Sequence, residues 1–497
     1  MGPVLMPATA FKLHTLFIRF CFAMLMLLLS GSGNAAPVAD TTLADTKTAA
    51  ALQMLQSDDP QAVSHYVDAE LHSDTLQSFG GQGRERYIAY LSDLKRFHRS
   101  LQLGSAPQLS LHNGQQQISA HLRSANTELN YLLQLNLSAQ PPFRVTMVDL
   151  RDAPAKATAG AKLTMPQLTR QLSAYVDRLA SRGIFSGAVL LADAQGVLYQ
   201  SAKGMADLRF QVPNTVETRF NLASMNKMFT AISILQLAQA NKLSLQDKLV
   251  RYVDPSLFAA ADFQHITLQQ LLSHTAGLGW PEYPDQQHHQ FRQLQQYRPL
   301  LKHLSLIAKP GSRFAYSNEG MLLLGMVIEQ VSGLPYDDYV QRKIFAKAGM
   351  VASGNFDLDG VAPNMAMGYT YSSQLQSMQS NWLVQAVKGN AAGGGYATVG
   401  DLYQFAKALT GYQLLSAELT EAALSAKPAL NARSYGYGFS VRRGSNGVVV
   451  GHGGDFIGIS SGLRIYRDKG IILIVLANQS FASDPVFAKA ESLLQQL

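Results

Sequence analysis

The sequence predicts an α+β protein, in which a small N-terminal α+β unit precedes a larger unit with a mainly antiparallel sheet and a helical lobe. Three observations support this prediction. Apolar residues recur at helical spacing after Asn226. β-rich stretches fill residues 448–477, with a hairpin turn signal at Asp468-Lys469-Gly470, and a run of small residues separates the two units. The chain of 497 residues, 47% of them hydrophobic, is long enough for two domains and a large core.

Residues 36–151 predict helices followed by antiparallel strands. TAAALQMLQ and GRERYIAYLSDLKRF have helical patterns, whereas QQISAHLR, LNYLLQLNLS and FRVTMVDLRD resemble strands. The order is loosely similar to NTF2-like domains, and we expect an accessory domain here. Residues 152–164, DAPAKATAGAKLT, predict a linker, and residues 165–497 then form the second domain.

Residues 1–35 predict a secretory signal peptide. Lys12 and Arg19 precede an apolar run over residues 20–29, and small residues follow it up to Ala36. This run is short for a membrane span, so we expect no stable span after cleavage. The only cysteine, Cys21, lies in this segment, so the mature chain needs no disulfide. We therefore expect a secreted or periplasmic protein.

The pair Ser224 and Lys227 is the strongest chemical signal. The two residues lie three apart in NLASMNKMF, at the predicted start of a buried helix, so the lysine amine can reach the serine oxygen. A desolvated amine is one way to activate a serine nucleophile, and burial favours the neutral, proton-accepting form of a lysine. The helix N-terminus favours a developing anion nearby.

Two further motifs follow in chain order. Tyr316-Ser-Asn318 precedes an apolar run over 321–331 that predicts a helix, and His452-Gly453-Gly454 opens the β-rich stretches. We therefore expect a serine and a lysine on a buried helix, a tyrosine and an asparagine on a loop, and a histidine with glycines on an edge-like strand.

This ordered trio resembles the serine β-lactamase and penicillin-recognising enzyme superfamily, whose pattern is S-x-x-K, then Y-x-N or S-x-N, then K-T-G or H-x-G. The resemblance covers about residues 165–497, and it is carried further by LLSHTAGL, GGGYAT and GHGGDFIG. These stretches are similar to the class C β-lactamase-like branch, which also holds D,D-peptidases, D-aminopeptidases and esterases. It implies a transpeptidase-like domain with the site between sheet and helical lobe.

The resemblance also implies a role for each matched residue. Ser224 would form an acyl-enzyme, with Lys227 and Tyr316 sharing the role of base. Asn318 would bind the substrate amide and help to hold Lys227. The backbone N–H groups of Ser224 and Asp455 would form the oxyanion hole. Gly453 and Gly454 would leave room for the acyl group beside the strand.

His452 stands where the lactamase pattern has a lysine. Histidine titrates near 6.5 and is mostly neutral at pH 7, so it binds a substrate carboxylate less well than a lysine does. Because relatives with H-x-G include D,D-peptidases and esterases, this departure argues against a specialised β-lactamase.

We therefore predict an exported serine hydrolase that acts on D-amino-acid-containing peptides or on carboxylic esters and amides. The alternatives are a β-lactamase and a non-hydrolytic penicillin or muropeptide sensor. No cofactor and no metal are expected, since His288 and His289 lie in a Gln-rich stretch without a third ligand. The expected partner is a small-molecule or peptide substrate, including cell-wall-derived ones; without a basic cluster, nucleic acid is not expected. The sequence leaves the oligomeric state undetermined.

A second S-x-x-K match, Ser92-Asp-Leu-Lys95, provides a control. It lies in a charge-dense segment, so we predict an exposed helix face with a solvated lysine. Ser224→Ala should abolish hydrolysis because the nucleophile is removed, whereas Ser92→Ala should leave the rate unchanged. The measurement is the initial rate of ester hydrolysis, and equal losses in both variants would refute the assignment.

Overall fold

The computed structural model describes residues 41–77, 83–98, 100–112, 115–153, 162–258, 261–279, 290–302 and 304–497. The predicted signal peptide, most of the predicted linker and the pair His288 and His289 lie outside these ranges.

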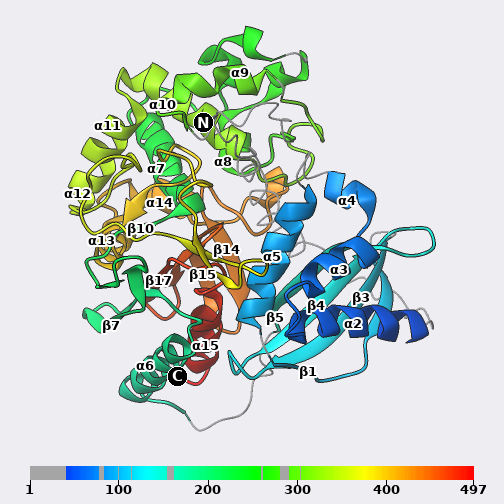
Figure 1. Ribbon diagram of the computed structural model, residues 1–497. Coiled ribbons are helices and arrows are strands. Elements are labelled where there is room, and N and C mark those ends of the chain that lie inside the picture. Colours follow the sequence, from blue (N-terminus) through cyan, green and yellow to red (C-terminus); the bar gives the residue numbers. More distant parts are fainter. Residues whose placement is uncertain are drawn as a thin grey trace, which may run out of the picture.

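The N-terminal part is a five-stranded antiparallel sheet with helices packed on one face (Figure 1). Its path order is β1-β3-β4-β5, with β2 also paired to β3. Alternate residues such as Ile118, Leu133 and Val148 face the helices and form the core. The helices are α2 (Thr41–Gln56), α3 (Ala62–Glu70), α4 (Ser73–Gln77) and α5 (Gly83–Phe97), and the strands are β1 (Leu101–Leu103), β2 (Gln108–His112), β3 (Gln115–Ser124), β4 (Asn130–Leu137) and β5 (Val145–Asp152).

The larger part is built on a six-stranded antiparallel sheet of order β14-β15-β16-β17-β6-β7. Strands from the beginning and the end of this part lie side by side in the sheet. Strand β17 pairs antiparallel with β6, and Ile474 lies opposite Leu190. The strands are β6 (Gly187–Ala192), β7 (Val197–Lys203), β14 (Ser440–Gly444), β15 (Gly447–Phe456), β16 (Ile459–Tyr466) and β17 (Ile471–Ala477). Asp468 to Gly470 form the predicted hairpin turn between the last two, where Gly470 has a φ of 64°.

The two faces of this sheet carry different layers. Leu473 and Val475 of β17 face a core shared with α6 (Met165–Ser181) and α15 (Asp484–Leu494). Ile474 and Leu476 face the opposite core, shared with the helical lobe. The lobe consists of α7 (Asn226–Gln239), α8 (Leu268–Leu272), α9 (Arg298–Leu301), α10 (Asn318–Ser332), α11 (Tyr336–Val340), α12 (Ala346–Ala348), α13 (Val399–Thr410) and α14 (Ala417–Ala423). The predicted α+β class, with a mainly antiparallel sheet and a helical lobe, is confirmed.

Short two-stranded ladders complete the larger part. They pair β8 (Met205–Asp207) with β9 (Val212–Pro213), β10 (Phe220–Asn221) with β13 (Tyr396–Ala397), and β11 (Tyr369–Ser372) with β12 (Ser377–Ser380). Within the described ranges, no helix has the length and apolar character needed to cross a bilayer.

Helix α5 attaches the N-terminal part to the larger part. The carboxyl group of Asp93, which is 5% exposed, accepts hydrogen bonds from the Thr370 hydroxyl, the Tyr371 backbone N–H (2.6 Å) and the Ser480 hydroxyl (2.8 Å). Burial raises the pKa of Asp93, although these donors oppose the shift.

The predicted exposure of Ser92 is wrong. Its side chain is 1% exposed; its hydroxyl donates to the Ile88 carbonyl (2.6 Å) and is hydrogen-bonded to the Ser373 hydroxyl (2.8 Å). The charge pattern of α5 did not reveal this burial, because the residues that cover Ser92 come from a hairpin about 280 residues later in the chain. Lys95 lies on the outer side, where its amine donates to the Asp59 carbonyl.

Asp93→Ala should lower the free energy of unfolding by about 1–3 kcal/mol, because the buried Tyr371 N–H and the Ser480 hydroxyl lose their acceptor. Urea titration of the full chain measures this change. Asp58→Ala removes a carboxylate from an exposed position of the same part and serves as the control. An Asp93→Ala variant as stable as the control would contradict the anchoring role.

Candidate active site

Ser224 lies where the chain enters helix α7. It belongs to a short 3₁₀ turn, Ala223–Met225, that leads directly into α7. Ala223 has a φ of 42°, a left-handed conformation that is costly for a residue with a side chain, and its N–H donates to the Asn221 side chain (2.8 Å). The residue before Ser224 is therefore held in a strained backbone conformation, as is common at functional sites.

Lys227 is fully buried beside Ser224. Its exposed fraction is 0%, and its Nζ lies 2.9 Å from the Ser224 Oγ. The amine also donates to the Ala392 carbonyl oxygen. The helical spacing thus produces the predicted contact, and the second bond fixes the amine from the other side.

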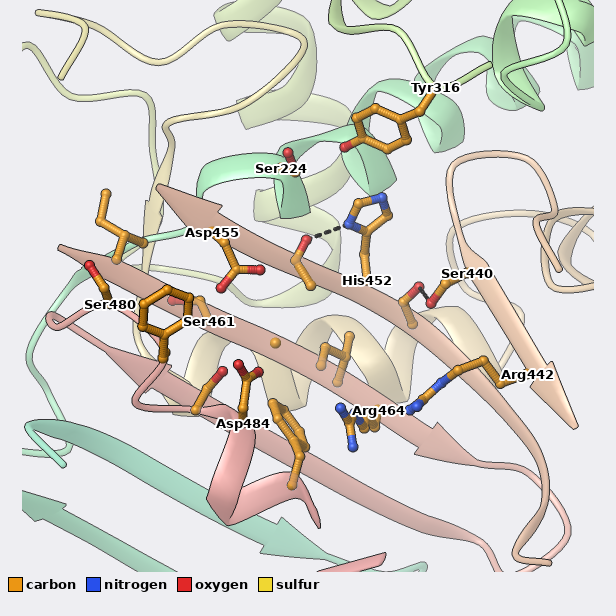
Figure 2. A pocket seen from close by; sticks show the side chains of 18 of the residues that line it. Ser224, Tyr316, Ser440, Arg442, His452, Asp455, Ser461, Arg464, Ser480 and Asp484 are labelled. Carbon is orange, nitrogen blue, oxygen red and sulfur yellow. Dashed lines mark hydrogen bonds between the residues drawn. The ribbon is translucent and has the colours of Figure 1, made fainter. Parts of the chain in front are cut away.

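Tyr316 lies above the same pair of residues. The Lys227 Nζ is 4.8 Å from the centre of the Tyr316 ring, and Figure 2 shows the tyrosine hydroxyl directed toward Ser224. Tyr316 belongs to a small buried cluster with Phe314, Ala432 and Tyr435. Packing in this cluster restricts the ring and so directs its hydroxyl.

His274 holds the loop that carries Tyr316, a role that sequence reasoning missed. Its carbonyl accepts from the Ala315 N–H (2.7 Å), its Nδ1 accepts from the Ser317 N–H (3.1 Å), and its ring lies 4.1 Å from that of Tyr316. Burial, together with the charge of Lys227, lowers the pKa of His274 well below its usual range. His274 is therefore neutral and positions the loop that carries Tyr316. Its place in LLSHTAGL, a stretch shared with the class C β-lactamase-like branch, could have indicated this role in the sequence.

His452 faces the same aromatic cluster from β15. Its Nδ1 contacts the Gly453 carbonyl, which can only accept, so Nδ1 carries the proton and Nε2 accepts from the Tyr435 hydroxyl (2.8 Å). Burial, and then the charge of Lys227, lower the pKa of His452 to about 3. The ring is therefore neutral near pH 7. Tyr435, which fixes this tautomer, was not identified from the sequence.

The remaining predicted residues differ in their surroundings. A Cβ added at Gly454 would lie 2.0 Å from the Leu222 carbonyl oxygen and 3.1 Å from the Ser224 nitrogen, so glycine lets β15 approach the nucleophile. Gly453 has no such neighbour and is exposed. Asp455 lies beyond them on β15, and Asn318 is the half-buried first residue of α10.

A cavity of about 270 Å³ lies beside the nucleophile. Ser224, Tyr316, His452, Gly453 and Asp455 line it, whereas Lys227, Gly454 and Asn318 lie outside its lining. Strand β14 pairs with β15 only as far as Gly451, so the β15 edge beyond it borders the cavity. Residues 147–150 of β5 form the opposite wall, which the sequence did not indicate.

A metal site is not evident in the described part of the chain, because no group of three or more His, Cys, Asp or Glu side chains there could hold a metal ion. The arrangement of a serine hydroxyl, an amine and a phenol around one point suits acyl transfer through the serine.

Comparison with known protein families assigns the larger part of the chain to one family. The model of the family described as Beta-lactamase matches residues 167–497. The chain therefore belongs to the β-lactamase family, and the predicted relation to penicillin-recognising enzymes is confirmed.

Individual relatives agree with this assignment. Penicillin-binding protein 4* of Bacillus subtilis is 28% identical over 330 residues, which cover 62% of this chain and 72% of that protein. Teichoic acid D-alanine hydrolase of Staphylococcus aureus is 24% identical over 303 residues, which cover 61% and 72%. The crystal structure of a penicillin-binding protein from Bacillus halodurans has a TM-score of 0.57 at 29% identity and covers 67% of this chain and 99% of that one. The protein is a serine hydrolase of the β-lactamase family.

The His452 ring should stay neutral between pH 5 and 8, because burial and the Lys227 charge disfavour its cation and move its titration to lower pH. Imidazole NMR signals, assigned by their absence in His452→Asn, should keep constant chemical shifts over this range. Free histidine in the same buffer titrates near 6.5 and is the reference. A midpoint between pH 5 and 8 for His452 would contradict the lowered pKa of this ring.

Proposed function

We propose that this protein is an exported serine hydrolase that cleaves D-aminoacyl esters, amides and peptides through an acyl-enzyme on Ser224. The observation that carries the proposal is the 2.9 Å contact between the Ser224 Oγ and the Nζ of the fully buried Lys227, at the end of a cavity. Such a pair is the activated nucleophile that acyl transfer requires.

The proposed reaction has two halves. The Ser224 oxygen attacks the substrate carbonyl and passes its proton to the Lys227 amine, while the backbone N–H groups of Ser224 and Asp455 bind the oxyanion. The bond to the leaving group then breaks, and the leaving group takes up a proton through Tyr316. Water next attacks the Ser224 ester, releases the carboxylic acid and returns the proton to the serine oxygen.

The proposed substrate class rests on charge and on similarity. His452 is neutral, so this strand position has no fixed positive charge that could bind a substrate carboxylate. The lysine of the K-T-G pattern supplies such a charge. The Staphylococcus aureus relative is named for hydrolysis of D-alanine from teichoic acid. Both observations favour an acyl group without a carboxylate, such as a D-aminoacyl group.

We also propose that residues 1–35 direct export and that residues 36–151 form an accessory domain. The basic residues, the short apolar run and the small residues before Ala36 support the first proposal. The separate hydrophobic core of the N-terminal sheet supports the second.

The two alternatives, a β-lactamase and a sensor, are separated by a time course with penicillin. Intact-mass spectra should show an adduct that decays slowly in the wild type and never forms in Ser224→Ala, because the same serine would open the lactam ring. Ser105→Ala, which removes a hydroxyl from an exposed position outside the cavity lining, is the control and should acylate as the wild type does.

The same spectra report the fate of the drug. Rapid loss of penicillin without an adduct would favour a β-lactamase, and an adduct that never decays would favour a sensor. Adduct formation in Ser224→Ala would refute the proposed nucleophile.

A further inference from the structure

The cavity beside the nucleophile has a second wall, which the N-terminal sheet supplies. The cavity is lined by Ser224 and His452 of the larger part and by residues 147–150 of β5. Figure 2 shows two of its lining residues, Ser224 and Asp484, on opposite sides of this region. Because β5 is the last strand of the N-terminal sheet, the part of the chain before residue 153 borders the same space as the nucleophile.

Met147 is a large apolar side chain of β5 that points away from the core of its own sheet. Val148 and Leu150 belong to the core between the sheet and its helices, so alternation along the strand directs Met147 to the opposite face. Met147 is half-buried, lines the cavity, and is part of none of the hydrophobic clusters found among the described residues. An unbranched thioether side chain adapts to apolar groups of different shape. Met147 is therefore available to an apolar group in the cavity.

Phe481, in the segment between β17 and α15, borders the same cavity. Its φ is 63°, a left-handed conformation that is unusual for a bulky residue. Its half-buried ring makes edge-to-face contacts with Tyr90 and Phe97 of α5, whose ring centres lie 5.8 Å and 6.0 Å away. Helix α5 thus holds a strained residue with its ring at the cavity wall, and such strain is common at binding sites.

Further apolar side chains continue this wall. Tyr90 of α5, Ile459 at the start of β16 and Phe487 of α15 are all buried and line the cavity. Together with Met147 and Phe481 they form an apolar surface that segments from both parts of the chain build. Burial of an apolar ligand group against such a surface is favourable because it removes both surfaces from water.

The charged residues of the lining largely compensate one another. Arg442 and Arg464 both bind Glu491, at 3.0 Å and 2.6 Å. The charge of Arg464 also acts on Asp455 and Asp484, where it opposes the rise in pKa that burial causes. These groups therefore leave no strong excess of one charge, and an apolar ligand group does not have to displace their partners.

Asp149 shows that water is largely excluded from the β5 wall. It is directed to the same face of β5 as Met147, two residues further along the strand. Burial raises the pKa of Asp149 to about 6, with the charge of Arg151 opposing the shift. Surroundings that disfavour a charged carboxylate favour an apolar group over a charged one.

We propose that Met147 and Phe481 form a pocket for the apolar side chain of the acyl group, so that the N-terminal sheet takes part in substrate selection. This inference rests on the proposed function. Gly453, which lines the cavity, leaves the β15 edge open where the acyl group is expected to lie. A D-aminoacyl group with its carbonyl at Ser224 would then direct its side chain toward the apolar wall. The preferred substrates are D-aminoacyl compounds whose side chain is larger than a methyl group.

The test compares D-leucine p-nitroanilide with D-alanine p-nitroanilide, which share the leaving group and the ammonium and differ only in the apolar side chain. The wild type should prefer D-leucine in kcat/KM. Met147→Gln keeps the approximate length of the side chain but makes it polar, and should lower the ratio of D-leucine to D-alanine about tenfold. Met147→Trp fills the pocket and should lower the ratio at least as much, while kcat/KM for D-alanine stays within about twofold of the wild type.

Leu111→Gln is the control, because it makes an apolar residue polar at an exposed position of β2 outside the cavity lining. It should keep the wild-type ratio. An unchanged ratio in both Met147 variants, equal losses for the two anilides, or a wild-type preference for D-alanine would overturn the pocket.

The proposed function still stands after each of those results, as long as Ser224→Ala loses hydrolysis of both anilides. If the wild type hydrolyses neither anilide, or if Ser224→Ala hydrolyses both at the wild-type rate, the proposed function fails, and the pocket fails with it.

Discussion

The close approach of β15 to the turn before α7 is the constraint on which the site depends. Gly454 faces the Leu222 carbonyl and the Ser224 nitrogen at a separation that leaves no space for a Cβ. This contact joins the sheet to the helical lobe at the nucleophile. Any residue with a side chain at position 454 would push the strand away and move the Asp455 N–H from the serine. The two layers would still pack, but the backbone donors would no longer meet at one carbonyl.

Near that contact, the neutral rings of His274, His452 and Tyr435 position Tyr316. His274 and His452 are both buried near Lys227, and burial keeps both rings uncharged. Neutral imidazoles can accept hydrogen bonds, which is how His274 holds the Ser317 N–H and His452 holds the Tyr435 hydroxyl. The cluster thus orients Tyr316 without placing a cation beside Lys227.

The N-terminal sheet contributes to this site as well as covering it. Asp93 and Ser92 of α5 bind the β11 hairpin and the segment after β17, so β5 is held against the cavity. Residues 147–150 of β5 therefore line the same cavity as Ser224. A hydrolase of this family with a different N-terminal segment would have a different wall at this end of the cavity.

The sequence alone determined the features that follow from local periodicity. Spacing of three on a helix places Lys227 at Ser224, alternation predicts β3 to β5, and the turn at Asp468 to Gly470 predicts the β16–β17 hairpin. Only the tertiary structure decided which distant residues meet. Asp149, Tyr435 and His274 join the site, and Ser92 is buried, through packing between segments far apart in the chain. Local patterns record which face of an element is apolar, but they do not record which partner covers it, because that depends on how whole layers pack.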